Sequence, residues 1–474
     1  MKAAVVVEPV EVLFGEVNIP GDKSISHRSV MLSALATTPT HITGFLSGLD
    51  ALASLDAIQK IGISVEKLSP TEIYINGQGS EHFKTLLSGN RRFDFDFHNA
   101  GTGMRLFSGL FSLASCPITL TGDESLRHRP MKRITVPLRK MGVDIQGRIL
   151  ADSDEELAPL RLNYHQASIP RSKNKLKPID YVLPQASAQV KSCLLLAGLF
   201  IEGETRITEP IPTRDHTERM LREFGFKIKK QDNKIAIQGS TKELNIGINN
   251  NQYEIVKDFS SAAFFIVAAL IAIRSEIVIR KVGLNPTRTG LLTVLLQMGA
   301  DIQIANLSSL HEEPVGDLII TDKNILKGTH VSREMLALMI DEFPIFLLAA
   351  LKASSPTVIE GIEELAHKES HRIETMVKAL SQLGAKFEVN YTENKLIVYP
   401  LISIRATTID LSLDSAKDHR VAMSLFIASL FGTGRLKIEA IENIQTSFPD
   451  FFEEAKKIGF CFKLITNQGG RECQ

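Results

Sequence analysis

Hydrophobic and polar positions along the chain follow a pattern that repeats. An amphipathic run ends in an apolar residue and a glycine, and a strand-like apolar alternation follows, as in IQKIGISVEK, LRKMGVDIQG and LLQMGADIQI. The glycines lie 74 to 85 residues apart and are Gly62, Gly142, Gly225, Gly299, Gly384 and Gly459. A glycine at such a place is typical of a helix C-cap, where one left-handed residue ends the helix before a strand. The pattern therefore predicts six copies of one unit that together fill the chain.

A second recurring element lies 38 to 43 residues before each glycine. It is a helix rich in small and apolar residues, and its copies begin near Ser24, Gly101, Ser187, Ser260, Asp341 and Asp418. Copies such as SAAFFIVAALIAI are apolar on nearly every side, which predicts a buried helix. Strand-like stretches such as PITLTG lie between the two helices. The predicted unit is strand, buried helix, strand, surface helix, strand, strand.

A period near 80 residues is longer than that of the common solenoids, so we expect two globular α/β lobes of three units each. The alternative is a set of six accidental helix–glycine–strand junctions in an ordinary α/β protein. The constant order and spacing of the paired elements favour the repeat.

Composition and charge exclude several classes of protein. The chain has 54 basic and 54 acidic side chains, and a general nucleic-acid binder usually needs a basic surplus. The longest uncharged apolar stretch, 259–273, is too short to span a membrane, and the apolar run at the start is too short for a signal peptide. We therefore expect a cytoplasmic protein without a nucleic-acid or membrane partner.

The four cysteines give no sign of a metal site. Cys116, Cys193, Cys461 and Cys473 form no CxxC pair and have no histidine close by, so metal-ligand spacing is absent. Cys193 falls in the apolar run CLLLAGLF, which predicts a buried thiol. So few cysteines fit a reducing compartment.

Polar residues suited to chemistry gather at the starts of the buried helices, in PGDKSISHRS, NAGTGMR, ASAQVKS, MIDEFP and KDHRVAM. Helix N-termini have free N–H groups and a positive dipole end, so they attract anions. Lysines and arginines at several such ends predict a site for multiply anionic small ligands. The residues at these helix starts include Lys23, Ser24, Arg28, Asn99, Gly101, Thr102, Arg105, Ser187, Gln189, Lys191, Asp341, Asp418, His419 and Arg420. The loops RHRPMKR, TRDHTER and AHKESHR add Arg127, Arg129, Arg214, Lys368, Glu369 and Arg372.

Each of these residues alone has an ordinary structural interpretation. Polar residues at helix starts are usually caps, Asp418 with Arg420 reads as a surface ion pair, and Glu369 as a solvated charge. A P-loop is excluded, because Asp22 separates Gly21 from Lys23 and the earlier glycine position holds Glu16. The functional interpretation rests on equivalent places in repeated units.

The motifs, in this order, resemble those of the 5-enolpyruvylshikimate-3-phosphate synthase (3-phosphoshikimate 1-carboxyvinyltransferase) family. They are PGDKSISHRS, NAGTGMR, RPM, ASAQVKS, TRDHTERML, NPTRTG, MIDEFP, KES, DHR and TSFPDFF, and they span Val17 to Phe452. The forms ASAQVKS, TRDHTERML and TSFP look like the class II bacterial branch. The resemblance implies the inside-out α/β barrel fold of enolpyruvyl transferases, with three βαβαββ units per lobe. One lobe would be residues 22–253 and the other 1–21 with 254–474, with the active site in the cleft between them.

The resemblance also implies the reaction. The family transfers the enolpyruvyl group of phosphoenolpyruvate to the 5-hydroxyl of shikimate 3-phosphate and releases phosphate, a step of chorismate and aromatic amino acid biosynthesis. It implies that shikimate 3-phosphate contacts Lys23, Ser24, Arg28, Ser187, Ala188, Gln189, Arg214, Asp341 and Lys368. It implies that phosphoenolpyruvate contacts Lys23, Gly101, Arg129, Gln189, Arg372 and Arg420. We expect no metal, no organic cofactor and a monomer.

The implied catalytic residues are Asp341, Glu369 and Lys23. Glu369 would protonate the methylene carbon of phosphoenolpyruvate, while Asp341 and Lys23 would manage the proton of the attacking hydroxyl. By the same resemblance we expect glyphosate to compete with phosphoenolpyruvate, and Gly101 leaves open a position that some class II relatives fill with alanine.

The chain departs from the family pattern in one loop, and two other functions remain to be weighed. The usual RVKESDR reads AHKESHR, with Ala366 and His371, which leaves the ion pairing of this loop open. A UDP-N-acetylglucosamine enolpyruvyl transferase typically has a cysteine in the loop that here reads TGDESLRHRPM, without one. A non-catalytic anion-binding paralogue would have lost acid or base residues, yet Glu369, Asp341 and Lys23 are present.

Overall fold

A computed structural model describes residues 3–150, 153–164, 176–243, 245–401, 411–432 and 434–465. The chain divides into two compact units. Unit 1 contains residues 1–20, 256–309 and 314–474, and unit 2 contains residues 21–255 with 310–313. The resemblance places residues 310–313 in the lobe that contains 1–21 and 254–474, whereas the structure differs at this segment. The structure groups them with unit 2 because they contact it.

The described residues form six four-stranded sheets of one design, which the second repeat shows without interruption. Its elements are β6 (Phe93–Asp96), α4 (Gly101–Leu110), β7 (Ile118–Thr121), α6 (Lys132–Lys140), β8 (Ile145–Ile149) and β9 (Glu156–Leu162). The strand order is β6-β7-β9-β8, with β6 parallel to β7 and the other neighbours antiparallel. This is the predicted βαβαββ unit.

Two more repeats are continuous in sequence. The third consists of β10 (Asp180–Val182), α7 (Ala188–Gly198), β11 (Gly203–Thr208), α8 (His216–Glu223), β12 (Ile228–Gln231) and β13 (Lys234–Gly239). The fifth consists of β18 (His330–Val331), α12 (Phe343–Lys352), β19 (Thr357–Glu360), α13 (Arg372–Gln382), β20 (Phe387–Asn390) and β21 (Lys395–Val398).

The other three repeats are completed by strands from distant parts of the chain. The first takes β14 (Gln252–Glu254) beside α1 (Lys23–Leu35), β3 (Thr40–Thr43), α2 (Leu49–Ile61), β4 (Ser64–Ser69) and β5 (Glu72–Asn76). The fourth takes β2 (Val12–Val17) beside α9 (Phe259–Ile271), β15 (Arg274–Gly283), α10 (Gly290–Gln297), β16 (Asp301–Leu310) and β17 (Glu313–Thr321). The sixth takes β1 (Ala4–Val7) beside β22 (Leu411–Asp414), α14 (His419–Ile427), β23 (Leu436–Glu439), α15 (Phe451–Lys457) and β24 (Phe462–Ile465).

The repeat glycines have the predicted conformation. All six lie one or two residues beyond a helix, with left-handed φ between 89° and 117°. A residue with a Cβ atom is strained in this region, so glycine ends each helix at the same place in the unit.

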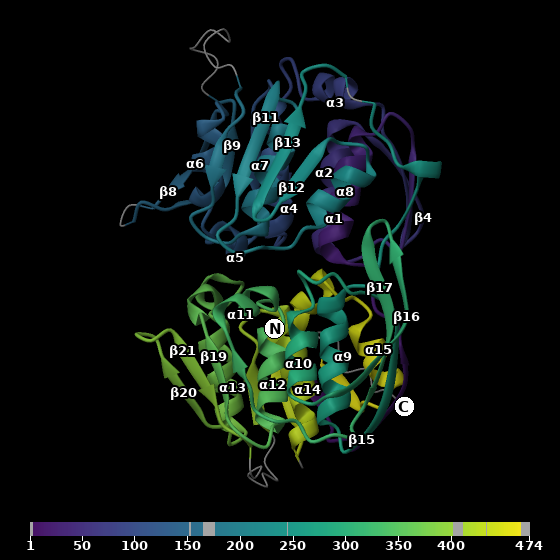
Figure 1. Cartoon of the computed structure of the whole chain (residues 1–474), viewed down its shortest axis with the longest axis vertical. Coiled ribbons are helices and arrows are strands. Elements are labelled where there is room, and N and C mark those ends of the chain that lie inside the picture. The colour runs from purple at the N-terminus through teal and green to yellow at the C-terminus, as the bar shows by residue number, and fades with distance from the viewer. Residues whose placement is uncertain are drawn as a thin grey trace. The chain divides into compact units, whose positions relative to one another are not determined.

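The predicted buried helices form the core of each unit and begin within two residues of the expected positions. Every residue of α9 is buried, and α9 packs against α12 and α14 in unit 1 (Figure 1). In unit 2, α4 packs against α7 and α1. Cys193 on α7 is buried as predicted, whereas Cys473 lies outside the described residues. Among the described residues, no helix is long and apolar enough to cross a bilayer.

Candidate functional site

The start of helix α1 presents the first predicted cation. Asp22 caps the helix, since its carboxylate accepts a hydrogen bond of 2.9 Å from the backbone N–H of Ile25. Lys23 occupies the first helical position, and its Nζ lies 3.0 Å from Oδ2 of Asp50. The ion pair with Asp50 holds the ammonium group in place. The Lys23 side chain is still 17% exposed, so solvent reaches it. Ser24 follows and is half-buried.

Arg28 lies one turn further along α1 and is fixed by three hydrogen bonds. Its guanidinium donates to Oγ1 of Thr217 at 2.6 Å and to Oγ of Ser192 at 2.9 Å. It also donates to the backbone oxygen of Ser24 at 2.7 Å. The side chain is almost fully buried, so Arg28 joins α1 to α7 and α8. Such a fixed guanidinium is prepared for an anion without much loss of rotamer entropy.

The starts of helices α4 and α7 are joined by side chains from two predicted motifs. Oε1 of Gln189 accepts from Arg105 at 2.5 Å, and Nε2 of Gln189 donates to Oγ1 of Thr102 at 2.9 Å. Ser187 caps α7 by accepting from the N–H of Val190, and Ala188 is the first helical residue. The free N–H groups of two helices therefore belong to one cluster with Arg105.

Arg129 extends this cluster toward the start of α4. Its guanidinium donates to Oδ1 of Asn99 at 2.5 Å and to the backbone oxygen of Asn99 at 3.3 Å. A Cβ atom on Gly101 would lie 2.9 Å from Nη1 of Arg129. Gly101 therefore leaves room for the guanidinium, which agrees with the importance given to this glycine by the sequence. Arg214 lies half-buried in the loop before α8.

Unit 1 contains a second charged cluster, centred on Arg372 at the start of α13. The guanidinium is fully buried, and its Nε donates to Oδ2 of Asp418 at 2.9 Å. Its Nη2 lies 2.5 Å from Oε2 of Glu369, and its Nη1 lies 3.3 Å from Oδ1 of Asp341. Burial alone would lower the pKa of Arg372, but the three carboxylates raise it, so the side chain remains a cation.

Asp341 connects Arg372 to two more cations. Lys368 Nζ lies 3.4 Å from its Oδ1, and Arg420 Nη2 lies 3.9 Å from its Oδ2. Arg420 also donates to the backbone oxygen of Asp341 at 3.1 Å. Unit 1 therefore brings together the five site residues predicted within it: Asp341, Lys368, Glu369, Arg372 and Arg420.

Two residues of the AHKESHR loop contact a buried carboxylate and a helix start. Ser370 donates to Oδ2 of Asp418 at 3.1 Å, the same oxygen that Arg372 contacts. His371 instead caps α13, and its Nδ1 accepts from the N–H of Glu374. His371 therefore serves as the cap of α13, and its Nε2 also lies 3.6 Å from Oε1 of Glu374. The side chain at position 366 lies outside the described residues.

Three neighbours of the predicted cations were not singled out in the sequence. Asp50 holds Lys23 and belongs to a segment without a distinctive motif, whereas Ser192 and Thr217 hold Arg28 and lie within the motifs ASAQVKS and TRDHTERML. Asp418 was interpreted alone as part of a surface pair, yet it is fully buried and both caps α14 and binds Arg372. Repetition could have found it, because Asp22 and Asp258 cap the equivalent helices α1 and α9.

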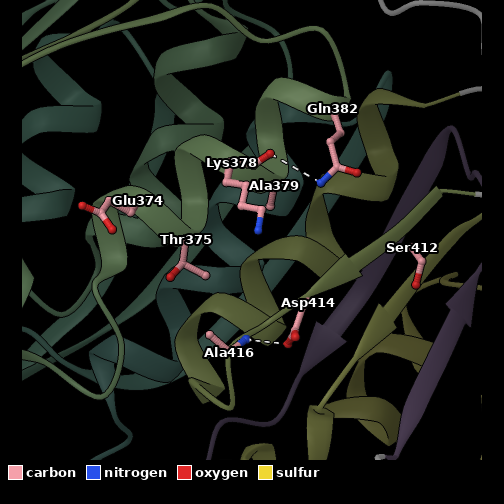
Figure 2. A pocket seen from close by; sticks show the side chains of 8 residues that line it. All are labelled: Glu374, Thr375, Lys378, Ala379, Gln382, Ser412, Asp414 and Ala416. Carbon is pink, nitrogen blue, oxygen red and sulfur yellow. Dashed lines mark hydrogen bonds between the residues drawn. The ribbon is translucent and has the colours of Figure 1, made fainter.

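A pocket of about 390 Å³ lies elsewhere on unit 1, between α13 and β22 (Figure 2). Its lining offers the carboxylates of Glu374 and Asp414 and the single cation Lys378. None of the predicted site residues lines it. This set of charges does not suit a ligand with several negative groups.

Six βαβαββ repeats with cations collected at helix starts define a protein that binds small, multiply charged anions. Comparison with known protein families identifies the group to which this chain belongs. The profile described as EPSP synthase (3-phosphoshikimate 1-carboxyvinyltransferase) matches residues 7–455. The chain therefore belongs to the EPSP synthase family.

Relatives and solved structures agree with this assignment. The chain is 41% identical to the 3-phosphoshikimate 1-carboxyvinyltransferase of Petrotoga mobilis, over 95% of this chain and 98% of the relative. It is 42% identical to the enzyme of that name from Methylococcus capsulatus, over 94% and 95% of the two chains. The EPSP synthase structure from Acinetobacter baumannii has a TM-score of 0.81 and 39% identity, covering 98% of this chain and 100% of that chain. The enolpyruvyl transferase NikO from Streptomyces tendae, at 16% identity and a TM-score of 0.72 over 98% and 99%, shares the fold.

Proposed function

We propose that this protein transfers the enolpyruvyl group of phosphoenolpyruvate to the 5-hydroxyl of shikimate 3-phosphate, giving 5-enolpyruvylshikimate 3-phosphate and phosphate. The observation that carries the proposal is the gathering of Lys368, Glu369, Arg372 and Arg420 around Asp341. Family membership supports it, because full-length relatives near 41% identity have the name of this activity. UDP-N-acetylglucosamine transfer is not favoured by these relatives.

Shikimate 3-phosphate is bound by residues of both units in this proposal. They are Lys23, Ser24, Arg28, Ser187, Ala188, Gln189 and Arg214 from unit 2, and Asp341 and Lys368 from unit 1. The fixed guanidinium of Arg28 and the capped starts of α1 and α7 support this assignment, since each is suited to a phosphate or hydroxyl group.

Phosphoenolpyruvate is bound by Lys23, Gly101, Arg129 and Gln189 with Arg372 and Arg420. Arginine suits this ligand, because it stays charged and contacts carboxylate or phosphate through two parallel hydrogen bonds. The absence of a side chain on Gly101 supports the assignment, since it leaves the Arg129 guanidinium in place.

The chemistry follows from the placement of Glu369. Glu369 gives a proton to the methylene carbon of phosphoenolpyruvate, which makes the neighbouring carbon electrophilic. The 5-hydroxyl attacks that carbon, and Asp341 with Lys23 takes up the hydroxyl proton. The tetrahedral intermediate then loses phosphate and returns a proton to Glu369, which restores the double bond. The contact of 2.5 Å from Arg372 orients the Glu369 carboxyl for both transfers.

The test is phosphate release from the purified protein with both substrates, compared with Glu369→Gln. We expect release that needs both substrates and falls by at least about 100-fold in the variant. Glu374→Gln is the matched control, because Glu374 lies five residues further along the chain in the first turn of α13 with a side chain 66% exposed, and it should retain full activity. Release by Glu369→Gln at the wild-type rate would refute the role of this residue, and binding of shikimate 3-phosphate without any release would indicate a non-catalytic paralogue.

We further propose that the enzyme belongs to the class II bacterial branch and acts in the cytoplasm as a monomer without a metal or organic cofactor. The motif forms ASAQVKS, TRDHTERML and TSFP support the class II assignment. Light scattering during gel filtration tests the oligomeric state, and activity after dialysis against EDTA tests the metal.

A further inference from the structure

Lys191 lies in the motif ASAQVKS, yet the proposed function gives it no contact with a substrate. Its side chain is completely buried in helix α7. Nζ lies 3.0 Å from Oε2 of Glu209 and 2.7 Å from Oε1 of Glu218, and both carboxylates are at most 1% exposed. One cation and two carboxylates therefore form a buried charge cluster at the first turn of α7.

A buried charge cluster of this kind is a poor way to stabilise a fold. Removing charges from water costs several kcal/mol per ion, and well-packed apolar residues often do as well or better. Lys191 could have been a leucine, as four residues of the following segment CLLLAGLF are.

The cluster ties α7 to the loop before α8. Lys191 Nζ donates to the backbone oxygen of Thr213 at 3.4 Å, and the Thr213 hydroxyl donates to the Glu209 carboxylate. The side-chain amide of Asn233 donates to the backbone oxygen of Glu209 at 2.8 Å, which fixes the beginning of the loop. Thr213 directly precedes Arg214, a proposed phosphate contact, so these hydrogen bonds attach the loop that carries Arg214 to Lys191 and Glu209.

The residues next to the cluster hold a second proposed phosphate contact. Ser192 follows Lys191 and Thr217 precedes Glu218, and their hydroxyls lie 2.6 Å apart. Both accept hydrogen bonds from Arg28. The same segments that meet at Lys191 therefore place Arg28, and α7 also places Ser187 and Gln189 at its start.

We infer that Lys191 is the positioning residue of the shikimate 3-phosphate half of the site. Lys191 holds Glu209, Glu218 and the Thr213 carbonyl, and so fixes the positions of α7, the loop that carries Arg214, and α8 relative to one another. In these positions the proposed contacts on the three segments can bind the same shikimate 3-phosphate. This inference rests on the proposed function. Burial raises the pKa of Glu209 against the opposing effect of Lys191, which fits a cluster with one carboxyl in excess.

The experiment replaces the whole cluster, so that no unpaired charge is left buried. The variant is Lys191→Met with Glu209→Gln and Glu218→Gln. The matched control is Arg139→Met with Glu156→Gln, which removes an ion pair of 2.5 Å between α6 and β9 in the same unit. Both are assayed by calorimetric binding of shikimate 3-phosphate alone and by steady-state kinetics, with thermal unfolding measured in parallel.

We expect the cluster variant to bind shikimate 3-phosphate at least about tenfold more weakly, since displacement of binding groups by about 1 Å has effects of this size or larger. At saturating shikimate 3-phosphate its KM for phosphoenolpyruvate should rise by a smaller factor than its Kd for shikimate 3-phosphate, because Gln189 is the one proposed phosphoenolpyruvate contact on α7. The control should bind shikimate 3-phosphate like the wild type, even if both variants unfold at a lower temperature. Equal binding by the cluster variant and the control would overturn the inference.

A gentler variant covers the case in which the triple substitution does not fold. Thr213→Val removes only the hydroxyl bound to Glu209 and keeps all three charges. It should weaken shikimate 3-phosphate binding severalfold, and Thr213→Ser should restore it. Wild-type binding by Thr213→Val would contradict the inference. An inactive wild-type protein would instead contradict the proposed function, so the two failures are distinguishable.

Discussion

At the scale of single residues, the site keeps cations charged inside the protein by surrounding them with carboxylates. Arg372 shows this most clearly, because Asp418, Glu369 and Asp341 all contact one fully buried guanidinium. Removing one partner would leave charge uncompensated in a place with little water. The cluster is therefore stable only as a set, and an anionic substrate that enters it competes with carboxylates already present.

Gly101 gives a prediction about the donor substrate. A methyl group added in Gly101→Ala would lie 2.9 Å from Nη1 of Arg129, closer than the two atoms can approach without movement. The guanidinium must move away from its bonds to Asn99. We expect KM for phosphoenolpyruvate to rise about tenfold while binding of shikimate 3-phosphate stays unchanged. Steady-state kinetics check this, and an unchanged KM for phosphoenolpyruvate would refute it.

His27 gives a prediction about pH. Burial, together with Lys23 and Arg28, lowers the pKa of His27 from 6.5 to about 3. Between these pH values His27 is protonated in the unfolded chain and neutral in the native protein. The contribution of His27 to the free energy of unfolding is therefore fully present above pH 6.5 and is lost as the pH falls toward 3. From pH 7.5 to pH 5 this residue should remove about 2 kcal/mol of unfolding free energy.

The control for this prediction is His27→Gln, which cannot take up the proton. Urea titrations at both pH values should show a loss for the wild type that exceeds the loss for His27→Gln by that amount. Parallel losses in the two proteins would show that other groups cause the pH dependence.

Sequence reasoning identified the cations of the site better than the residues that hold them. Lys23, Arg28 and Arg420 stand out because they recur at the starts of the buried helices, and Arg372 because it lies in the basic loop AHKESHR. Of their partners, Asp50 comes from the next helix of the same repeat and Thr217 from a helix two repeats later, and only folding brings them close. A buried partner is set by three-dimensional packing, which leaves no fixed spacing to read.

At the scale of elements, one device ends six helices. The repeat glycines could be predicted because each unit must end a helix with a left-handed residue before the next strand begins. The same residue type therefore recurs at nearly the same interval in the sequence. The completion of three sheets by β1, β2 and β14 had no such local signal, because a parallel or antiparallel partner can come from anywhere in the chain.

Gly225 isolates the backbone effect of this device. Nothing lies within 4 Å of a Cβ atom at this position, and φ is +89°. Gly225→Ala should therefore lower the unfolding free energy by about 1–2 kcal/mol through backbone strain alone. Gly225→Asn should cost less, because asparagine tolerates left-handed conformations. Denaturant unfolding measures both, and equal stability of Gly225→Ala and the wild type would contradict the strain argument.

At the scale of the whole molecule, the two units contribute separate charged clusters to one proposed reaction. Ligand that binds only the native protein should therefore stabilise it by mass action. Shikimate 3-phosphate at 100 times its Kd should add about 2.7 kcal/mol and raise the unfolding temperature. Shikimate without its phosphate is the control, and an equal shift by both compounds would contradict recognition of the phosphate by the cations.

The resemblance also predicts inhibition by glyphosate. Glyphosate is an anion that we expect to compete with phosphoenolpyruvate for the same cations. Increasing inhibitor should raise the apparent KM for phosphoenolpyruvate and leave kcat unchanged. Inhibition that phosphoenolpyruvate cannot overcome, or none at achievable concentrations, would exclude competition at this site.

The pairing of β1 has a consequence for how the protein is made. Val5 lies opposite Ile438, and its other neighbour is Leu464, so β1 pairs with two strands that the ribosome makes much later. At about 5–20 residues per second, translation keeps β1 waiting on the order of half a minute for these partners. Unit 2, by contrast, has every strand of its three sheets once β14 has been made, at residue 254. The nascent chain therefore carries the apolar AVVV segment without its partner strands while the strands of unit 2 can already pair.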